Sequence, residues 1–468
     1  MDVFPFKEQS PSEMVVILAL GFLIVPIAVF IAVISDTSLI WPLGLWAFLS
    51  LVILYARFRF SFLDVFFFLL PLVRSGISSL LMVPRNWVAL CLIFLFFSYC
   101  FVDRCNSGWQ QEPIRTPYSP FLIVFSFLFI PSLFANPMHE RALSFLTQTL
   151  PLVAVYWIIS QLLVGKSLPR LLKAFILGSV ANASIFMIAF LGSNTKMFMQ
   201  GYLYGMMRPL VLGENANTWP YTAVMGSVII LSFLIYGKVR RIDQLWMVPA
   251  LLLLLAVIVI NMSRTAILGF LVSTVFLMAT HPRSRKVLIY FLVLLNLTLI
   301  PILPYIWPKI EILFRFYRGL SGREYLWPLA WQILEDHVLL GIGPANFQGL
   351  LCLVAPLMPN GLSLVAGGPS AHNIWLHVGV EIGLLAPIVM LLMVLYFAAR
   401  SKKLWFKLIS SDQFPVLVAI CAVVIFGFVR SIFESDFIIR PGNLANNLMI
   451  IVIFAIQYQL AVRSNPAA

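Results

Sequence analysis

Long apolar windows recur along almost the whole chain, and this repetition constrains the fold more than any other feature of the sequence. Windows of about 17–25 apolar residues match the roughly 30 Å hydrocarbon core of a bilayer when each forms a helix. Hydrophobic residues make up 61% of the chain and charged residues 10%, whereas soluble domains contain roughly 45–50% and 25%. The sequence therefore predicts an all-α polytopic membrane protein with a single transmembrane domain over residues 1–468.

The apolar windows predict about 12–14 transmembrane helices. The polar segment before the first window has no small-residue cleavage site, so we expect that window to be retained rather than removed as a signal peptide. Our count is fourteen spans, at 14–34, 39–56, 62–82, 86–102, 120–134, 143–164, 170–191, 219–236, 245–260, 265–280, 287–306, 373–398, 414–433 and 443–462.

The chain carries a formal net charge of +13. In a membrane protein the first explanation is retention of Lys and Arg on the cytoplasmic side, so we expect the lipid bilayer as a partner and no nucleic acid. Most basic residues follow every second span, on the side that also holds both termini. The positive-inside rule then places both termini in the cytoplasm and the segments 192–218, 261–264, 305–372 and 434–442 outside it.

Residues 305–372 form the one large loop between predicted spans, and within it Tyr325–Leu340 has helical periodicity. Gly341 and Gly343 supply a stop for this helix. An amphipathic helix here either lies on the outer membrane face or caps the helical bundle, and the sequence leaves both open. The apolar positions at helical spacing are Leu326, Ala330, Ile333, Leu334 and Val338.

Three arginines, Arg208, Arg264 and Arg323, fall outside the cytoplasm and close to predicted spans. A guanidinium near hydrocarbon usually has an anionic partner or reaches the headgroups. The acidic residues on that side, Glu434 and Asp436 among them, give these three no obvious partner. If the arginines converge, they suit a diphosphate, whose oxygens each guanidinium grips with two donors; otherwise they are separate interfacial anchors.

His372 opens the predicted span 373–398 after a flexible Gly-Gly-Pro-Ser segment. A helix N-terminus and nearby arginines favour neutral imidazole, which accepts a proton as a general base; the alternative is a simple cap. His377 and Glu381 share a helix face, as a hydrogen-bonded structural pair or as support behind the site. The possible supporting residues are thus Asn373, His377, Glu381 and His337. We expect no metal and no cofactor, because no cluster has metal-ligand spacing.

The order of these motifs resembles the superfamily of O-antigen ligases, Wzy-type polysaccharide polymerases and bacterial protein O-oligosaccharyltransferases. The resemblance covers about residues 200 to 400. Its motifs are SGREYLWPLAWQILEDHVLLGIGPANF (Ser321–Phe347), AHNIWLHVGVEIGLLAP (Ala371–Pro387), Arg208 ahead of Asn215 and Asn217, and Ser263-Arg264. The ligases resemble twelve-helix proteins, whereas we count fourteen spans.

The resemblance implies a metal-independent enzyme of the bacterial inner membrane with a periplasmic active site. Such an enzyme takes a glycan from an undecaprenyl-diphosphate carrier and inverts the anomeric carbon. The acceptor hydroxyl belongs to a lipid A core sugar, a lipid-linked glycan or another molecule. By resemblance, His372 is the base on the acceptor and Arg208 and Arg264 bind the diphosphate. Asn215, Asn217 and Arg323 complete the substrate pocket, and the alternative role for Arg323 is to fix the loop.

Three functions stay open. A ligase transfers a finished glycan, and a polymerase joins lipid-linked units at the same donor site. A lipid-linked oligosaccharide flippase or an anion transporter is a different class. Transport needs no loop of this size on one side, and ion-coupled transporters usually carry acids within the membrane, for which only Asp64 and Glu381 qualify. The enzyme is therefore favoured.

Overall fold

The elements described by the computed structural model are α-helices, and six of them are long and apolar enough to cross a membrane. This confirms the predicted all-α polytopic class. The structure describes residues 62–81, 89, 93, 116–134, 151–192, 211, 217–237, 241–290, 307, 323–354, 370–436, 439–440 and 443–464. The helices are α3 (Phe62–Leu81), α5 (Ser119–Phe134), α7 (Pro151–Leu162), α8 (Leu168–Gly192), α10 (Trp219–Tyr236), α11 (Arg241–Ile260), α12 (Arg264–Thr280), α14 (Arg323–Asp336), α15 (Asn346–Val354), α17 (Ile374–Ile382), α18 (Leu385–Leu408), α19 (Phe414–Phe433) and α20 (Leu444–Arg463).

Hydropathy places most of the described spans well. Helices α10 and α19 have the predicted bounds, 219–236 and 414–433. Helices α11, α12 and α20 begin or end within a few residues of prediction. The predicted spans 14–34 and 39–56, most of 86–102 and most of 287–306 lie outside the described residues. The total of 12–14 helices therefore stays a prediction.

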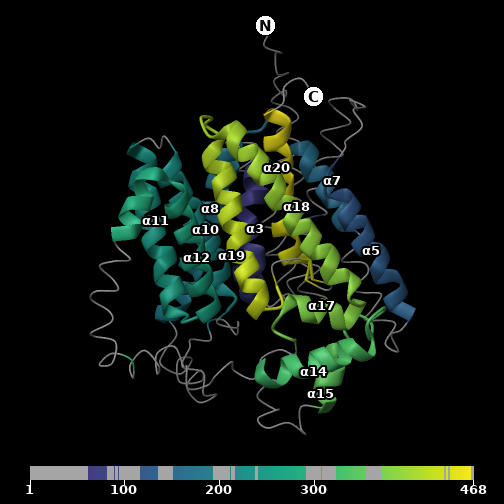
Figure 1. The fold of residues 1–468 in the computed structure, drawn as a ribbon. Helices are drawn as coiled ribbons and strands as arrows, with labels where there is room; N and C mark the ends of the chain where they lie inside the picture. The colour runs from purple at the N-terminus through teal and green to yellow at the C-terminus, as the bar shows by residue number, and fades with distance from the viewer. Residues whose placement is uncertain are drawn as a thin grey trace, which may run out of the picture.

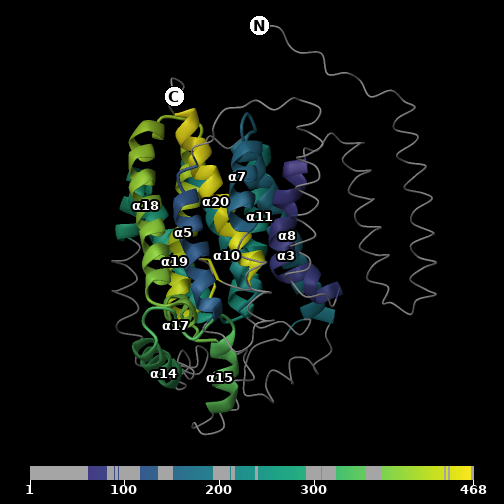
Figure 2. The ribbon, with the colours of Figure 1, turned by 90° about the vertical axis from the view of Figure 1, so that its right-hand side faces the viewer.

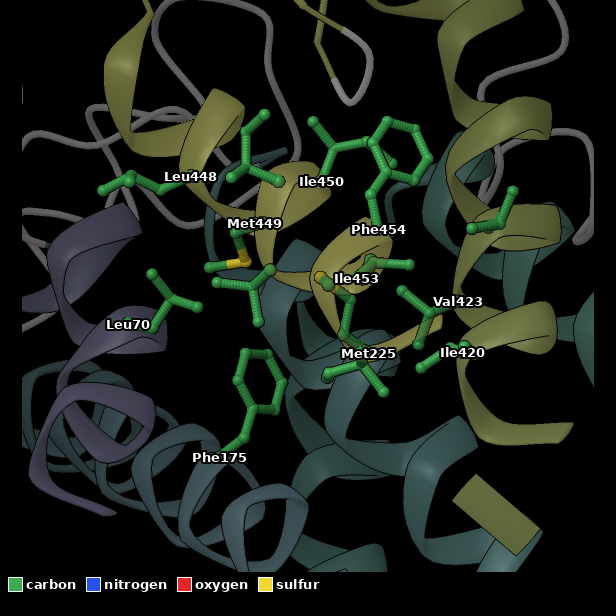
Figure 3. Close-up of a cluster of buried hydrophobic side chains, with 14 of the residues drawn as sticks. Leu70, Phe175, Met225, Ile420, Val423, Leu448, Met449, Ile450, Ile453 and Phe454 are labelled. Atoms are coloured by element: carbon green, nitrogen blue, oxygen red, sulfur yellow. The ribbon is translucent and has the colours of Figure 1, made fainter. Parts of the chain in front are cut away.

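Three helices form the centre of the bundle (Figure 1). The shares of their apolar windows that are buried are 78% for α10, 72% for α19 and 78% for α20, against 39%, 28% and 33% for α8, α11 and α18. The outer helices thus turn an apolar side to lipid. Figure 3 shows part of the hydrophobic core of the bundle. Five helices contribute to it, with Leu70, Phe175, Met225, Val423 and Ile453 as one residue from each.

Small and polar residues hold the spans together, as expected where lipid gives no hydrophobic drive for helix association. At Gly178 of α8, a Cβ atom would lie 1.9 Å from the carbonyl oxygen of Phe68 in α3, so only glycine permits this approach. Asn182 Nδ2 donates to Thr222 Oγ1 at 2.8 Å between α8 and α10. These contacts fix the frame on which the polar end of the bundle is built.

The two ends of the bundle differ in charge. At one end Lys173 Nζ lies 2.9 Å from Asp243 Oδ2, which joins the starts of α8 and α11, and Arg463 donates to the Leu163 carbonyl. The opposite end carries α14, α15 and α17 (Figures 1 and 2). The predicted orientation rests on the gathering of basic residues at the first of these two ends. The basic residues at or beyond the helix ends on the first side include Lys166, Arg170, Lys173, Arg241, Arg283, Arg285, Lys286, Lys402, Lys403, Lys407 and Arg463.

Helix α14 lies in the predicted loop and caps the bundle. It spans Arg323–Asp336, so it begins two residues before the predicted helix and ends four residues earlier. Its buried residues are Leu326, Ala330 and Leu334, and the last two pack with Val380 of α17. Val338, predicted to belong to that apolar face, lies in the following turn and is 42% exposed. The helix thus ends before the predicted stop, and Gly341 and Gly343 lie in the turns that follow it, both with positive φ, 63° and 90°.

The predicted single span 373–398 is wrong, because the chain breaks at Gly383 into α17 and α18. Gly383 has φ 96° and ψ 166°, a conformation essentially restricted to glycine. A Cβ atom there would lie 2.1 Å from the carbonyl oxygen of Leu339. Helix α17 lies across the end of the bundle (Figure 1), and α18 alone forms the span. The break places α17 and the residues before it at the membrane boundary.

We predict that Gly383→Ala destabilises the protein by roughly 3 kcal/mol or more. Alanine would be strained in this backbone conformation, and its Cβ atom would clash with the Leu339 carbonyl oxygen. Thermal unfolding of the purified protein in detergent measures the loss. Gly349→Ala in α15 is the matched control, since a Cβ atom there meets nothing within 4 Å. Equal effects of the two changes would show that the corner does not need glycine.

Candidate active site at one end of the bundle

The carboxylate of Glu434 joins three other chain segments at the end of the bundle that carries α14 and α17. Its Oε1 accepts a hydrogen bond from Asn217 Nδ2 at 2.8 Å and from Arg323 Nη2 at 3.2 Å. Its Oε2 lies 3.2 Å from Nδ1 of His372. We call these four residues the Glu434 cluster. Three of its members, Asn217, Arg323 and His372, were predicted site residues, and the structure brings them together.

Helix ends position the members of the cluster. Glu434 caps the C-terminus of α19, and Asn217 lies just before α10. Arg323, at the start of α14, also donates from Nε and Nη2 to the carbonyl oxygen of Phe433, at 3.1 and 2.7 Å. This satisfies one of the carbonyls that a helix C-terminus leaves without an intrahelical partner. Arg323 therefore ties the long loop to α19, the loop-fixing role that the sequence left open.

An ion pair links α19 to the segment that follows it. Arg430 is buried, and its Nε and Nη2 donate to both carboxylate oxygens of Asp436 at 2.8 and 3.0 Å. Nη2 also donates to the Asn217 carbonyl at 3.1 Å, and the guanidinium stacks over the Tyr221 ring at 5.0 Å. A guanidinium in an apolar span is costly unless it is paired in this way. The pair fixes the chain on both sides of Glu434.

The electrostatics of the cluster keep Glu434 ionised. Burial alone would raise the pKa of this carboxyl, but the hydrogen bond from His372 and the charges of His372, Arg430 and Arg323 outweigh burial and hold the pKa below its usual range. A carboxylate facing Nδ1 favours the tautomer with hydrogen on Nδ1. Nε2 is then a proton acceptor, and the His372 side chain is 21% exposed.

Backbone contacts hold His372 in position. Asn373 is the N-cap of α17, and its Oδ1 accepts from the backbone N–H groups of Trp375 and Leu376 at 3.0 and 3.1 Å. His372 itself has φ 47°, in the left-handed region of the backbone that residues other than glycine seldom adopt. Trp327 of α14 donates to the carbonyl of Ala371 at 3.0 Å. Asn373 thus acts as a cap that sets the backbone beside the histidine.

Arg264 lies beside the cluster. It opens α12 directly after Ser263, whose Oγ donates to Asn217 Oδ1 at 2.9 Å. Asn217 shares the Oε1 atom of Glu434 with Arg323, so the start of α12 lies near the start of α14. Burial lowers the pKa of the half-buried Arg264 guanidinium, and the charge of Arg323 lowers it further. Two of the three predicted arginines therefore converge at this end. The third, Arg208, and the predicted Asn215 lie outside the described residues.

His377 and Glu381 form a buried layer behind the cluster, in α17. Nε2 and Oε2 lie 3.7 Å apart, too far for the hydrogen bond that we expected. Glu381 Oε1 instead accepts from the backbone N–H of Ala345 at 3.1 Å, which fastens the loop to α17. Burial raises the pKa of Glu381 to about 8, against the charge of Arg440 and the Ala345 hydrogen bond, and burial lowers the pKa of His377 well below its usual value.

His337 does not belong to this site. Arg323 begins α14 and His337 follows its last residue. Because a helix of 14 residues is about 21 Å long, His337 lies about that far from Arg323. The side chain is exposed. The structure therefore places this predicted supporting residue away from the cluster.

Sequence reasoning missed Glu434, Arg430 and Asp436. It named the two acids without assigning them partners, and Glu434 in fact pairs with Arg323. The signal that would have found them is Arg430, a charged residue inside the predicted apolar span 414–433. Such a residue requires a partner, and Asp436 follows six positions later.

Fold and site together define a helical membrane protein with a histidine, a carboxylate and converging arginines at one end of its bundle. Residues 249–391 match the family model described as O-antigen ligase. This segment contains Arg264, Arg323 and His372, and the match confirms the predicted resemblance to the O-antigen ligase and Wzy-type superfamily. Asn217 and Glu434 lie outside the matched segment. No curated protein matches the chain.

The buried layer behind the site predicts a pH dependence of stability. Between pH 6.5 and 8 the unfolded chain has an ionised Glu381, whereas the folded protein keeps it protonated, so the folded state binds more protons and stability falls as pH rises. Below pH 6.5, His377 has the opposite effect, because the unfolded state then gains its proton. The expected loss from pH 6.5 to 8 is about 2 kcal/mol.

Glu381→Gln should remove most of this slope, measured by unfolding of the purified protein in detergent at both pH values. Glu335→Gln is the control, because Glu335 is exposed on α14 and should leave the slope unchanged. A Glu381→Gln variant with the slope of the unaltered protein would contradict the assignment.

Proposed function

We propose that this protein transfers a glycan from a lipid-diphosphate carrier to an acceptor hydroxyl at the membrane face outside the cytoplasm. The observation that carries the proposal is the Glu434–His372 pair next to Arg323 and Arg264. It supplies a proton acceptor and cations at one membrane boundary. The family match over residues 249–391 supports the same class of membrane glycosyltransferase.

His372 is the general base in this proposal. As the acceptor oxygen attacks the anomeric carbon and forms the new C–O bond, its proton passes to Nε2 of His372. Glu434, facing Nδ1, holds the ring in the required tautomer and stabilises the imidazolium that forms. General-base catalysis of this kind contributes about 10²- to 10⁴-fold in rate.

The arginines stabilise the leaving group. The bond between the anomeric carbon and the phosphate oxygen breaks, and its electron pair stays with the diphosphate of the carrier. Arg264, together with Arg208 as the sequence predicts, neutralises the charge that develops there. Arg323, held between Phe433 and Glu434, contributes its positive charge from the loop side. Attack opposite the departing oxygen inverts the anomeric carbon.

The donor is an undecaprenyl-diphosphate-linked glycan, and the site faces the periplasm from the bacterial inner membrane. The basic end of the bundle supports this orientation, because retained Lys and Arg mark the cytoplasmic side. The acceptor is a lipid A core sugar, as in a ligase. A Wzy-type polymerase, with a second lipid-linked glycan as acceptor, uses the same donor site and is the alternative within the class.

The described spans support the enzyme over ion-coupled transport. Their acidic residues, Asp64 and Asp243, lie in the first helical turns at the basic end and are paired with Arg170 and Lys173 at 2.7 and 2.9 Å. Glu381, the other acid considered for transport, lies in α17 and not in a span. Neither place suits an ion-coupling acid at mid-membrane depth.

His372→Ala should lower the transfer rate by about 10²-fold or more, because the acceptor loses its base. Cells with this variant should accumulate glycan on the lipid carrier, as measured by extraction and separation of glycolipids. Long stranded chains indicate a ligase, and single repeat units indicate a polymerase. His337→Ala, an exposed change in the same loop, should keep full activity. Normal glycan assembly with loss of donor movement across the membrane would instead establish transport.

Glu434→Gln should lower kcat by about 10²- to 10⁴-fold, because the amide no longer stabilises the imidazolium. The KM for the donor should change far less, since diphosphate binding rests mainly on the arginines. Glu434→Asp retains the carboxylate and should recover part of kcat. An unchanged kcat in Glu434→Gln would remove Glu434 from the mechanism and weaken the case for His372 as base.

A further inference from the structure

An open apolar groove of about 640 Å³ runs along the side of the bundle, lined by α12, α18 and α19. Both α12 and α18 pack on α19, which forms the floor. The groove is a concave apolar surface on the side of the bundle. Representative lining residues are Val272 and Phe276 from α12, Leu391 and Leu395 from α18, and Val424 and Phe428 from α19.

The groove is long and nearly uniform in chemistry. Along α18 its lining runs from Leu391 to Phe406, which corresponds to about 22 Å at 1.5 Å per residue, most of the roughly 30 Å hydrocarbon thickness. Its polar members are Thr280, Ser401 and Lys402, and these lie toward the basic end of the bundle. The remaining length offers only apolar and sulfur-bearing side chains.

The other end of the groove leads to the Glu434 cluster. Phe428 lines the groove and packs edge-on against the Trp375 ring at a centroid distance of 5.8 Å. Trp375 Nε1 donates to Ser431 Oγ at 3.1 Å, and Trp375 follows His372 by three positions. On α12, Val272 lies eight positions after Arg264, about 12 Å along the axis. The apolar surface therefore ends within a few turns of the arginine and the histidine.

We propose that this groove binds the polyisoprenoid chain of the lipid carrier while the diphosphate lies at Arg264. This inference rests on the proposed function and adds where the apolar part of the donor is held. An amphiphile with a long hydrocarbon chain and an anionic head matches the order of surfaces, with apolar lining inside the membrane and cations at its boundary. Affinity then increases with chain length, because each buried methylene adds favourable transfer free energy.

Leu395→Trp fills the middle of the groove, where Leu395 is 54% exposed. Transfer is measured with two donors that carry the same glycan diphosphate on an undecaprenyl-length chain or on a geranyl-length chain. We expect the KM of the long-chain donor to rise roughly tenfold or more in this variant, and the KM of the short-chain donor to stay within about twofold. Leu252→Trp on α11, another exposed position at 63% that does not line the groove, is the matched control and should behave as the unaltered protein.

A second measurement does not require turnover. A prenyl diphosphate with a diazirine in mid-chain should label peptides of α12, α18 and α19, and unlabelled long-chain prenyl diphosphate should compete while the short-chain form should not. Equal labelling of α11, or equal use of both donors by the unaltered protein, would overturn the groove assignment and leave the proposed function intact. If neither donor is used, the proposed function fails, and the labelling pattern still decides whether the groove binds the chain.

Discussion

The polar end of this protein depends on one buried ion pair, Arg430 with Asp436. A guanidinium inside an apolar span is tolerated only when it is paired, and Asp436 pairs with Arg430 through both carboxylate oxygens. The pair therefore determines where the chain goes after α19. Because Glu434 lies between the two residues, its position at the helix end follows from theirs. Removing either partner would leave an uncompensated charge and release the segment that carries Glu434.

Glu434 in turn fixes the positions of segments that are far apart in the sequence. One carboxylate connects the start of α10, the start of α14 and the residue two positions before α17. The long loop thereby gains a polar attachment to the membrane bundle at Arg323 and a second, buried attachment where Ala345 meets Glu381. Two attachments on either side of α14 hold it as a rigid cap, which in turn supports His372 through Trp327 and the Ala371 carbonyl.

Sequence reasoning located many of the membrane spans and several residues of the candidate site, but not Glu434, the residue that joins the site to the spans. The bounds of α10 and α19 follow from hydropathy alone, because burial in lipid is a property of a continuous window. The break at Gly383 was missed because α17 is itself apolar, so composition does not distinguish a helix that lies across the bundle end from the start of a span. His372, Arg264 and Arg323 were recognisable as polar groups in apolar surroundings. Glu434 was not, because its importance comes from three partners that only folding brings to it.

The order of surfaces along the bundle fits the proposed reaction at the membrane boundary. A lipid-linked donor is apolar at one end, anionic at its diphosphate and hydrophilic in its glycan, so a site that binds all three parts must change polarity over a short distance. Here the apolar groove ends at Phe428, the cations and the histidine follow, and the α14 face that looks away from α17 presents the exposed Tyr325, Gln332 and Glu335. Helix ends suit this boundary, since unpaired backbone groups and charged side chains are both tolerated there and not deeper in the bilayer. In the proposed reaction the bond that breaks lies between diphosphate and glycan, and hence at the level of His372.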